Sequence, residues 1–312
     1  MRTEGVTNCA HILIGVYDGA AHLPEQLASL AAQRHTNWRL TCSDDGSGDD
    51  SRAMIQQFAS EVCQDVKVVT GPQVGFSANF MSMIAVLPDA PGIVALCDQD
   101  DVWLESKLAR AVQYLDAVPG EMPALYCSRV ILWHPEQDTR TAGRGLPRAA
   151  SFRNALIENV AQGNTIVLNN AAAALAARAA RRTGPIFAHD WWLYLLITGA
   201  GGCVVFDETA SLLYRQHGRN AIGAGTGFGG QIRRKAAVLR GAYAARLAGN
   251  VAALEAVRDL LTPDAADALG SFAAARRTGP WGRIMCLRRA GVYRQRRLSD
   301  VSFWLGALIG RI

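Results

Sequence analysis

The sequence predicts an α/β fold, in which a mostly parallel central sheet is flanked by helices and followed by a helical C-terminal extension. Two observations predict it. Over residues 10–118, four apolar strand-like runs alternate with four helical patterns, as is typical of a parallel sheet with helices on its faces. Beyond residue 230 the chain becomes strongly basic and its patterns are helical.

The strand–helix units follow one another without an internal repeat. Each strand candidate is a short apolar run bounded by turn residues. Strands are expected over 10–18, 38–45, 65–70 and 92–101, with helices over 22–33, 49–62, 77–87 and 103–118. From residue 124 the pattern loosens into shorter strand candidates with helices between them, at 124–133, 165–170, 203–209 and 211–217.

Charge divides the chain into two parts. Residues 1–230 carry 17 Lys and Arg against 22 Asp and Glu, whereas residues 231–312 carry 15 against 5. The stretch AIGAGTGFGG ends the acidic part and has the composition of a flexible linker. We therefore expect an acidic main domain over 1–222, a Gly-rich linker or mobile loop over 223–230 and a basic helical extension over 231–312.

Several classes of protein are disfavoured by what the sequence lacks. It contains neither a G-x-G-x-x-G after the first strand nor a G-x-x-x-x-G-K-[ST], so dinucleotide and P-loop folds are not supported. The segment DDGSGDD lacks the bidentate Glu of a calcium loop. Seven scattered cysteines with no Cys-x-x-Cys pair predict reduced thiols in the cytoplasm and argue against zinc. No apolar run approaches the roughly 20 residues that span a bilayer.

Acidic residues close two of the strand candidates. Asp44 and Asp45 end WRLTCSDD, and Asp98, Asp100 and Asp101 end GIVALCDQDD. Ligands of open α/β sheets bind beyond the carboxyl ends of the strands, and acids gathered there repel one another unless a cation or ligand donors offset their charge. Because side chains alternate along an extended segment, Asp98 and Asp100 should share a side. One would hold a ligand hydroxyl and the other a divalent metal; the alternative is two solvated turns.

Four segments, in order, carry a resemblance to a known family. They are VYDGAAHLPEQLASLAAQ, SDDGSGDD, CDQDDVWLESKL and HDWWLYLLITGAGGCVVFDETASLLYRQHGRN. Over roughly residues 10–222 the chain resembles the family-2 inverting glycosyltransferases, so residues 1–222 are expected to form a catalytic domain of GT-A fold. DQDDVW and YRQHGRN are particularly similar to the branch that contains bacterial rhamnosyltransferases of O-antigen and cell-wall polysaccharide assembly.

The resemblance implies a site for a nucleotide-sugar donor. Asp45 would accept a hydrogen bond from a pyrimidine imide N–H, with Asp44 supporting the turn, and Asp98 would accept from a ribose hydroxyl. A plain structural turn is the alternative for the first pair. The other implied donor contacts are Tyr17, Asp18, Gly75, Asn79, Arg215 and Gln216.

The resemblance also implies a metal and a catalytic base. Asp100 would bind Mg²⁺ or Mn²⁺, which neutralises the charge of a departing nucleoside diphosphate, and Asp101 and His217 are the further candidate ligands. For His217 a solvated loop histidine is the alternative. Asp190, at the start of an apolar helix, is the candidate base; the alternative is a helix N-cap, which Asp favours. Gly163 and Trp191 are expected beside the acceptor, where the two tryptophans Trp191 and Trp192 would exclude water and line the acceptor site.

These roles predict an inverting sugar transfer. The expected donor is dTDP-L-rhamnose, with a UDP-sugar as the alternative, and the acceptor is a saccharide or lipid-linked oligosaccharide in bacterial surface polysaccharide synthesis. A sugar-nucleotide pyrophosphorylase would carry Lys and Arg in the first loop, where this chain has VYDGAAHLPE. A non-catalytic protein that binds nucleic acid through the basic tail is the other rival. Its aromatic residues are too sparse for a stacking platform, so no nucleic-acid partner is expected.

The end of the tail pairs arginines with an apolar helical face. Fifteen residues from 298 would extend about 22 Å as a helix, short of the roughly 30 Å hydrocarbon core, so lying in the interface of an anionic membrane fits better than crossing it. The protein would then sit at the inner face of the plasma membrane. Alternatively the face packs on the main domain or on a second subunit of a homodimer. The face comprises Leu298, Val301, Trp304, Leu305, Leu308 and Ile312.

Overall fold

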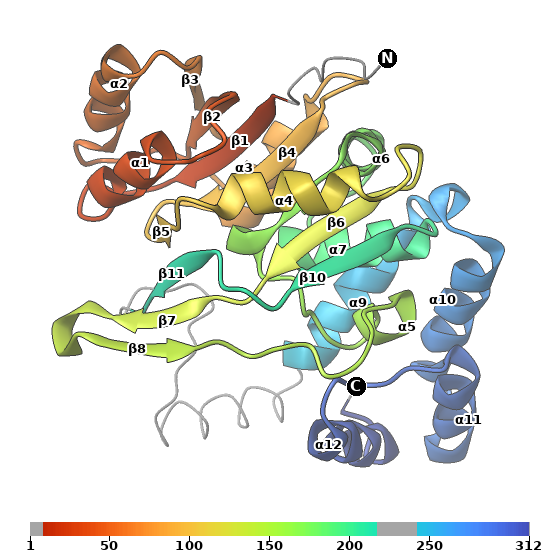
Figure 1. Ribbon diagram of the computed structural model, residues 1–312. Coiled ribbons are helices and arrows are strands. Elements are labelled where there is room, and N and C mark those ends of the chain that lie inside the picture. The colour runs from red at the N-terminus through yellow and green to blue at the C-terminus, as the bar shows by residue number, and fades with distance from the viewer. Residues whose placement is uncertain (1–8, 217–241, 312) are drawn as a thin grey trace.

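The computed structural model describes residues 9–216 and 242–311. Its centre is a seven-stranded sheet in the order β10-β6-β9-β4-β1-β2-β3 (Figure 1). Short β9 runs antiparallel to β4 and β6, while the remaining pairs are parallel, so the long strands end at one common edge. The strands are β1 (Ala10–Val16), β2 (Trp38–Asp44), β3 (Val66–Thr70), β4 (Ile93–Asp98), β6 (Ala124–Ser128), β9 (Val167–Leu168) and β10 (Cys203–Asp207).

Alternating side chains of the sheet bury two hydrophobic cores, one on each face. In β4, Val94 and Leu96 join one core, while Ile93, Ala95 and Cys97 join the other. This two-sided burial explains why central strands such as β4 are continuous apolar runs in the sequence. One face is covered by α1 (Leu23–Ala31), α2 (Ser51–Glu61) and α4 (Lys107–Asp116), and the other by α3 (Phe76–Ala85), α6 (Asn170–Ala180) and α7 (His189–Gly199).

A second, four-stranded sheet departs from the predicted pattern. Residues 124–133, expected as one strand, divide between β6 and β7 at Arg129, whose N–H still bonds to Asp207 at the end of β10 while its carbonyl accepts from Ser211 just before β11. Trp103, expected in a helix, pairs with Leu212 and so forms a short strand ahead of α4. This sheet contains β5 (Val102–Trp103), β11 (Leu212–Arg215), β7 (Ile131–His134) and β8 (Thr139–Ala142), with η1 (Pro135–Gln137) joining the last two.

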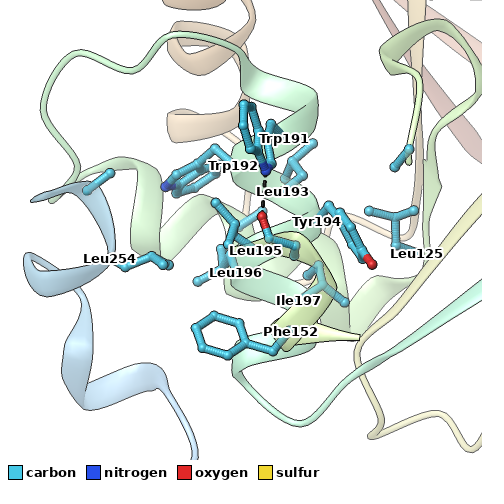
Figure 2. Close-up of a cluster of buried hydrophobic side chains, with 14 of the residues drawn as sticks. Leu125, Phe152, Trp191, Trp192, Leu193, Tyr194, Leu195, Leu196, Ile197 and Leu254 are labelled. Carbon is cyan, nitrogen blue, oxygen red and sulfur yellow. Dashed lines mark hydrogen bonds between the residues drawn. The ribbon is translucent and has the colours of Figure 1, made fainter. Parts of the chain in front are cut away.

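The C-terminal part is helical, as predicted, and packs on the α7 side of the sheet. Leu254, Phe272, Leu287 and Phe303 are buried in the same core as α7, and Figure 2 shows Leu254 facing the α7 side chains. The predicted linker over 223–230 lies outside the described residues. The elements are α9 (Ala242–Glu255), η3 (Arg258–Leu260), α10 (Pro263–Ala275), α11 (Pro280–Ala290) and α12 (Arg297–Leu308); two short pieces of the main domain are α5 (Phe152–Ala155) and η2 (Gly163–Thr165).

Cysteines and helix lengths agree with the expectations from the sequence. All seven cysteines are free thiols, and Cys42, Cys97 and Cys127 are buried. Among the described residues, no helix combines the length and the apolar character that crossing a membrane requires.

Candidate active site

Three aspartates gather just after β4, at the edge where the parallel strands end. Asp98 is the last residue of β4, and Asp100 and Asp101 lie in the chain that leads to β5. One carboxylate oxygen from each lies within 4.8 Å of the others. Carboxylate oxygens are the ligands that Mg²⁺ and Mn²⁺ prefer. The structure thus brings together the three residues that the sequence predicted as an acidic cluster.

The like charges of these carboxylates repel one another. Burial, together with the charges of Asp100 and Asp190, raises the pKa of Asp98 to about 7, while Lys107 acts in the opposite direction. Burial, together with the charges of Asp98 and Asp100, also raises the pKa of Asp101 well above its ordinary value. A divalent cation would relieve this repulsion and return both groups to their charged forms. The electrostatics of the site therefore fit a bound metal.

Asp101 is the most firmly held of the three. Its side chain is fully buried, and its carboxylate accepts from Asn164 Nδ2 at 2.6 Å and from the Arg215 backbone N–H at 3.2 Å. Lys107, which is also fully buried, donates from Nζ to the Asn164 carbonyl at 2.5 Å and lies over the Trp103 ring. Burial lowers the pKa of Lys107 to about 8. Sequence reasoning gave no role to Lys107 or Asn164, although Lys107 falls inside the CDQDDVWLESKL segment.

Arg215 supports the acidic cluster from β11. Its Nε donates to the Asp100 carbonyl at 2.9 Å, its Nη2 pairs with Glu25, and its guanidinium lies over the Trp133 ring. These contacts hold the Asp100 turn in place, a role that the sequence did not suggest; the predicted contact with donor phosphates stays a prediction. Gln216 is anchored through its backbone N–H to Trp133. That hydrogen bond to the Trp133 carbonyl measures 2.7 Å. His217, the further candidate metal ligand, lies outside the described residues.

The second acidic cluster organises the loops beside β2. Asp45 accepts from the backbone N–H groups of Gln73 at 2.6 Å and Gly75 at 3.0 Å, one with each oxygen. Asp44 accepts from the Ser47 N–H at 3.0 Å, which agrees with its predicted support of the turn. Asp45 therefore already orders the loop after β3, and its predicted contact with a nucleotide base would use the remaining lone pairs.

Tyr17 and Asp18 join the end of β1 to both clusters. Gln99, inside the Asp98–Asp101 segment, exchanges two hydrogen bonds of 2.9 Å with the backbone N–H and carbonyl of Tyr17. Asp18 has a positive φ of 44° and accepts from the Gly48 N–H at 2.8 Å. The Tyr17 side chain is exposed, which leaves its ring accessible to a ligand. The SDDGSGDD and CDQDD segments, which are far apart in the sequence, thus lie at the same edge of the sheet.

Gly75 and Asn79 position the start of α3. Gly75 is its N-cap with φ of 104°, a conformation that favours glycine, and a Cβ there would meet nothing within 4 Å. Asn79 is buried and bonded to Ser43 through both ends of its amide, with Nδ2 donating to the Ser43 carbonyl at 2.8 Å. Asn79 therefore fastens α3 to β2, and its predicted donor contact remains untested.

Asp190 lies in the first turn of α7, next to the acidic cluster. The N-cap of α7 is Ala188, so the alternative of Asp190 as the N-cap is wrong. Its carboxylate accepts from the Trp191 N–H at 2.6 Å and is also hydrogen-bonded by the Asn159 side chain and the Gly163 backbone. Burial nevertheless raises the pKa of Asp190 to about 6. A carboxylate with such a pKa can take up a proton near neutral pH.

Gly163 lies against the start of α7. A Cβ at this position would stand 3.1 Å from His189 Nε2 and 3.4 Å from the Asp190 Cβ. The glycine therefore makes room for the α7 side chains themselves, and the predicted contact with a sugar stays a prediction. His189 stacks on Phe80 with ring centroids 4.1 Å apart, and burial lowers its pKa to about 3, so its imidazole is neutral.

The two tryptophans of α7 belong to the hydrophobic core. Trp192 is fully buried, so the expectation that it lines the acceptor is wrong: α7 is apolar all round and packs on the sheet, α6 and α9. Trp191 is almost fully buried, and its indole N–H donates to the Ala155 carbonyl at 2.6 Å (Figure 2). Its predicted contact with an acceptor is left untested.

Comparison with curated proteins gives relatives that are all glycosyltransferases. The dTDP-rhamnosyl transferase RfbG of Shigella flexneri is 25% identical over 238 residues, 71% of this chain and 77% of the relative. An uncharacterized glycosyltransferase of Nostoc sp. is 31% identical over 102 residues, 33% of this chain and 31% of the relative.

Solved structures share the fold at low sequence identity. A mannosyltransferase of Pyrobaculum calidifontis, in complex with GDP-Man and Mn²⁺, superposes with a TM-score of 0.52 at 16% identity, over 91% of this chain and 86% of the other. Residues 1–349 of S. aureus TarS with UDP-GlcNAc give 0.52 at 14%, over 96% and 92%. These likenesses show a GT-A fold. The sequence profile of glycosyl transferase family 2 matches residues 11–172, and the chain belongs to that family of glycosyltransferases.

Proposed function

We propose that this glycosyltransferase moves L-rhamnose from dTDP-L-rhamnose, with inversion, to a saccharide or lipid-linked acceptor of bacterial surface polysaccharide. The observation that carries the proposal is the placement of Asp190 beside the acidic cluster, close enough for its charge to act on Asp98. The similarity to a dTDP-rhamnosyl transferase over 71% of the chain supports rhamnose as the sugar. A UDP-sugar is the second candidate, because a TarS structure of the same fold holds UDP-GlcNAc.

The metal and the base have separate tasks in this reaction. Asp100 and Asp101, with His217 as the further candidate, would hold Mg²⁺ or Mn²⁺, which when bound neutralises charge on the leaving diphosphate. Asp98 beside them would accept from a ribose hydroxyl of the donor. Asp190 removes the proton from the acceptor hydroxyl, whose oxygen forms a bond to the anomeric carbon as the bond to the diphosphate oxygen breaks. The proton ends on Asp190 and the electron pair on the nucleoside diphosphate. One displacement of this kind inverts the anomeric centre.

Donor choice is tested by thermal-shift measurements with UDP, dTDP, GDP and CDP, each with Mn²⁺ and with EDTA. Ligands that bind the folded state raise the unfolding temperature. We expect dTDP to give the largest rise and UDP the next, both with Mn²⁺ only. A preference for GDP would contradict the choice of a pyrimidine donor. Turnover of dTDP-L-rhamnose and UDP-glucose, followed as released nucleoside diphosphate, then separates the two candidate donors.

The pKa of Asp190 predicts an acidic limit to turnover. Burial raises this pKa to about 6, so the protonated and inactive form grows as the pH falls below that value. With saturating donor and Mn²⁺, kcat should be level above pH 7 and fall by about tenfold per unit well below pH 6. The measurement is a pH profile of kcat. A profile that stays flat far below pH 6 would remove Asp190 as the group that titrates.

We further propose that α12 lies on an anionic membrane surface at the inner face of the plasma membrane. Leu298 and Leu305 are 85% and 58% exposed, whereas Trp304 from the same predicted face packs against the core, and Ile312 lies outside the described residues. Exposed Arg296 and Arg297 stand at the start of the helix. Each arginine near anionic headgroups contributes about 1 kcal/mol to binding.

Liposome flotation tests the membrane contact. The wild-type chain should float with phosphatidylglycerol vesicles and not with phosphatidylcholine vesicles. The Leu298→Ser/Leu305→Ser variant should stay in the soluble fraction, whereas Ser302→Ala on the same helix should float as the wild type does. If the wild type stays soluble at low salt and elutes as a dimer, the face is a subunit contact instead.

A further inference from the structure

The segment Asn154–Asn159 touches the base on one side and the C-terminal helices on the other. On the side of the base, the Asn159 side chain hydrogen-bonds to the Asp190 carboxylate. Asn159 Oδ1 in turn accepts from the Ala161 N–H at 3.1 Å. The Ala155 carbonyl accepts the Trp191 indole N–H, one residue beyond the base. The position of Asp190 therefore depends on where this segment lies.

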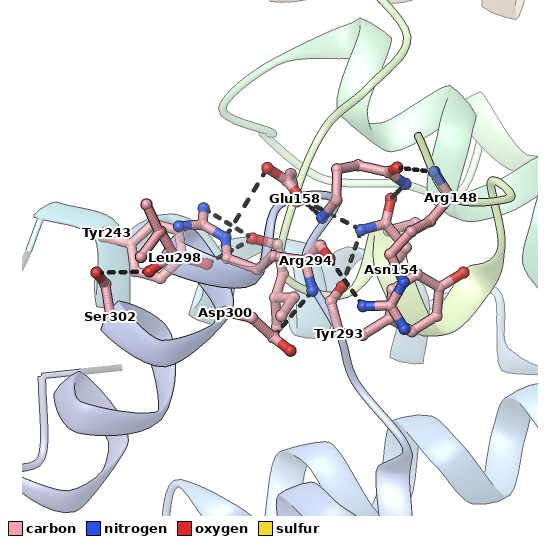
Figure 3. Close-up of polar contacts among 12 residues, drawn as sticks. Arg148, Asn154, Glu158, Tyr243, Tyr293, Arg294, Leu298, Asp300 and Ser302 are labelled. Atoms are coloured by element: carbon pink, nitrogen blue, oxygen red, sulfur yellow. Dashed lines mark hydrogen bonds and ion pairs between the residues drawn. The ribbon is translucent and has the colours of Figure 1, made fainter. Parts of the chain in front are cut away.

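The opposite side of the segment is bonded to the chain between α11 and α12. Gln295 is buried, and its backbone N–H donates to Glu158 Oε2 at 2.6 Å. Its side-chain Nε2 donates to Asn154 Oδ1 at 3.1 Å, while its Oε1 accepts from the Arg148 N–H at 2.9 Å. Asn154 Nδ2 donates to the Tyr293 carbonyl at 2.8 Å. Figure 3 shows Asn154 and Glu158 against Tyr293 and Arg294.

A second contact between the C-terminal part and this segment comes from α9. The Tyr243 hydroxyl donates to the Ile157 carbonyl at 2.5 Å, and the Arg294 guanidinium lies over the Tyr243 ring at 5.6 Å. Asn154 is itself fully buried, and its Oδ1 also accepts a hydrogen bond from the Tyr194 hydroxyl at 3.0 Å. In such a buried network each polar group depends on its partners, and loss of one leaves another unsatisfied. Two separate elements of the C-terminal part thus fix one short segment of the main domain.

We propose that the C-terminal helices position the catalytic base: Gln295 and Tyr243 are positioning residues that set Asp190 through the segment Asn154–Asn159. This inference rests on the proposed role of Asp190 as the base. It gives the C-terminal part a task in the chemical step, in addition to any task at the membrane. Among the described residues, the hydrogen bonds of Gln295 and Tyr243 go to the segment and its surroundings and not to the acidic cluster, so donor and metal binding should not depend on them.

The test compares Gln295→Ala, Tyr243→Phe and the double variant with the wild type, using dTDP-L-rhamnose, Mn²⁺ and a membrane extract as the source of acceptor. Because displacement of a reacting group by about 1 Å can cost on the order of 100-fold, we expect kcat to fall roughly 10-fold in each single variant and further in the double variant. The donor KM and the Mn²⁺-dependent thermal shift with dTDP should be unchanged. Tyr243→Phe removes a single hydroxyl, so it is the variant least prone to unfold.

Two controls separate positioning from general stability. Asp259→Ala breaks the ion pair with Arg182, which also ties the C-terminal part to the main domain but does not touch the segment; kcat should stay at the wild-type level. Glu158→Gln retains an acceptor for the Gln295 N–H and should keep kcat within about threefold, whereas Glu158→Ala should lose about tenfold.

The outcomes that overturn the proposal are distinct. Wild-type kcat in the double variant overturns it, and so does an equal fall of kcat in Asp259→Ala. An increase of donor KM with unchanged kcat would assign these residues to donor binding and also overturn it. Asp190→Asn is assayed beside them: if that variant is active, the proposed base fails and this inference with it. If it is inactive while the double variant is fully active, the positioning alone is wrong.

Discussion

Asp190→Asn should lower kcat by roughly 10²- to 10⁴-fold, the usual loss when a general base is removed. The amide keeps the size of the carboxylate, and its oxygen can still accept from the Trp191 N–H, so the first turn of α7 should keep its geometry. An amide cannot take the acceptor proton. The expected loss therefore falls on the chemical step, while the affinity for the donor should be nearly unchanged.

Steady-state release of nucleoside diphosphate measures kcat, and calorimetry with the donor measures affinity. Asp267→Asn, which removes a charge from an exposed position of α10, is the matched control and should behave as wild type. Turnover of Asp190→Asn within a fewfold of wild type would falsify the assignment of the base. An equal loss of donor affinity would instead assign Asp190 to donor binding.

Asp100→Ala should abolish Mn²⁺-dependent binding of the nucleoside diphosphate, and EDTA should do the same to the wild type. Loss of a group that merely orients a metal ligand costs 10- to 100-fold in metal affinity, so loss of a ligand should cost more than about 100-fold. Asp98→Ala should weaken nucleotide binding in a way that added metal does not restore, since its predicted partner is a ribose hydroxyl.

Calorimetric titration of Mn²⁺ and then dTDP measures both effects. Asp49→Ala is a suitable control, because this residue is also an aspartate of an acidic turn but bonds to Ser51 and the Ala20 N–H away from β4. Full turnover of the wild type in excess EDTA would leave Asp98, Asp100 and Asp101 as a structural turn and would contradict metal-assisted transfer.

The central sheet could be predicted from the sequence because burial on both faces turns its central strands, such as β4, into apolar runs. Aspartates at the ends of β2 and β4 then had to lie at one edge, since parallel strands end together. Asp190 lies at the same edge. In the sequence, only the resemblance to a glycosyltransferase family linked Asp190 to the aspartates that end β2 and β4. The local rules failed where long-range pairing decided the outcome, as in Trp103, which pairs with Leu212.

The supports of the site were beyond sequence reasoning for a physical reason. Lys107 has the sequence context of an ordinary helix residue, yet it is fully buried and bonds to the Asn164 carbonyl. Gln295 and Asn159 lie 136 positions apart in the chain, and nothing local in either indicates that one helps to place the other. Trp192 was assigned to the acceptor because it follows Asp190, but the helical turn directs it into the core.

A single displacement at the anomeric carbon, with Asp190 as the base, is tested most directly by the anomeric configuration of the product. The chain is incubated with dTDP-L-rhamnose, Mn²⁺ and a saccharide acceptor, and the new glycosidic bond is examined by proton NMR. The predicted result is a configuration opposite to that of the donor, formed by the wild type and not by Asp190→Asn. A product that retains the donor configuration would require two successive displacements and would contradict the role of Asp190.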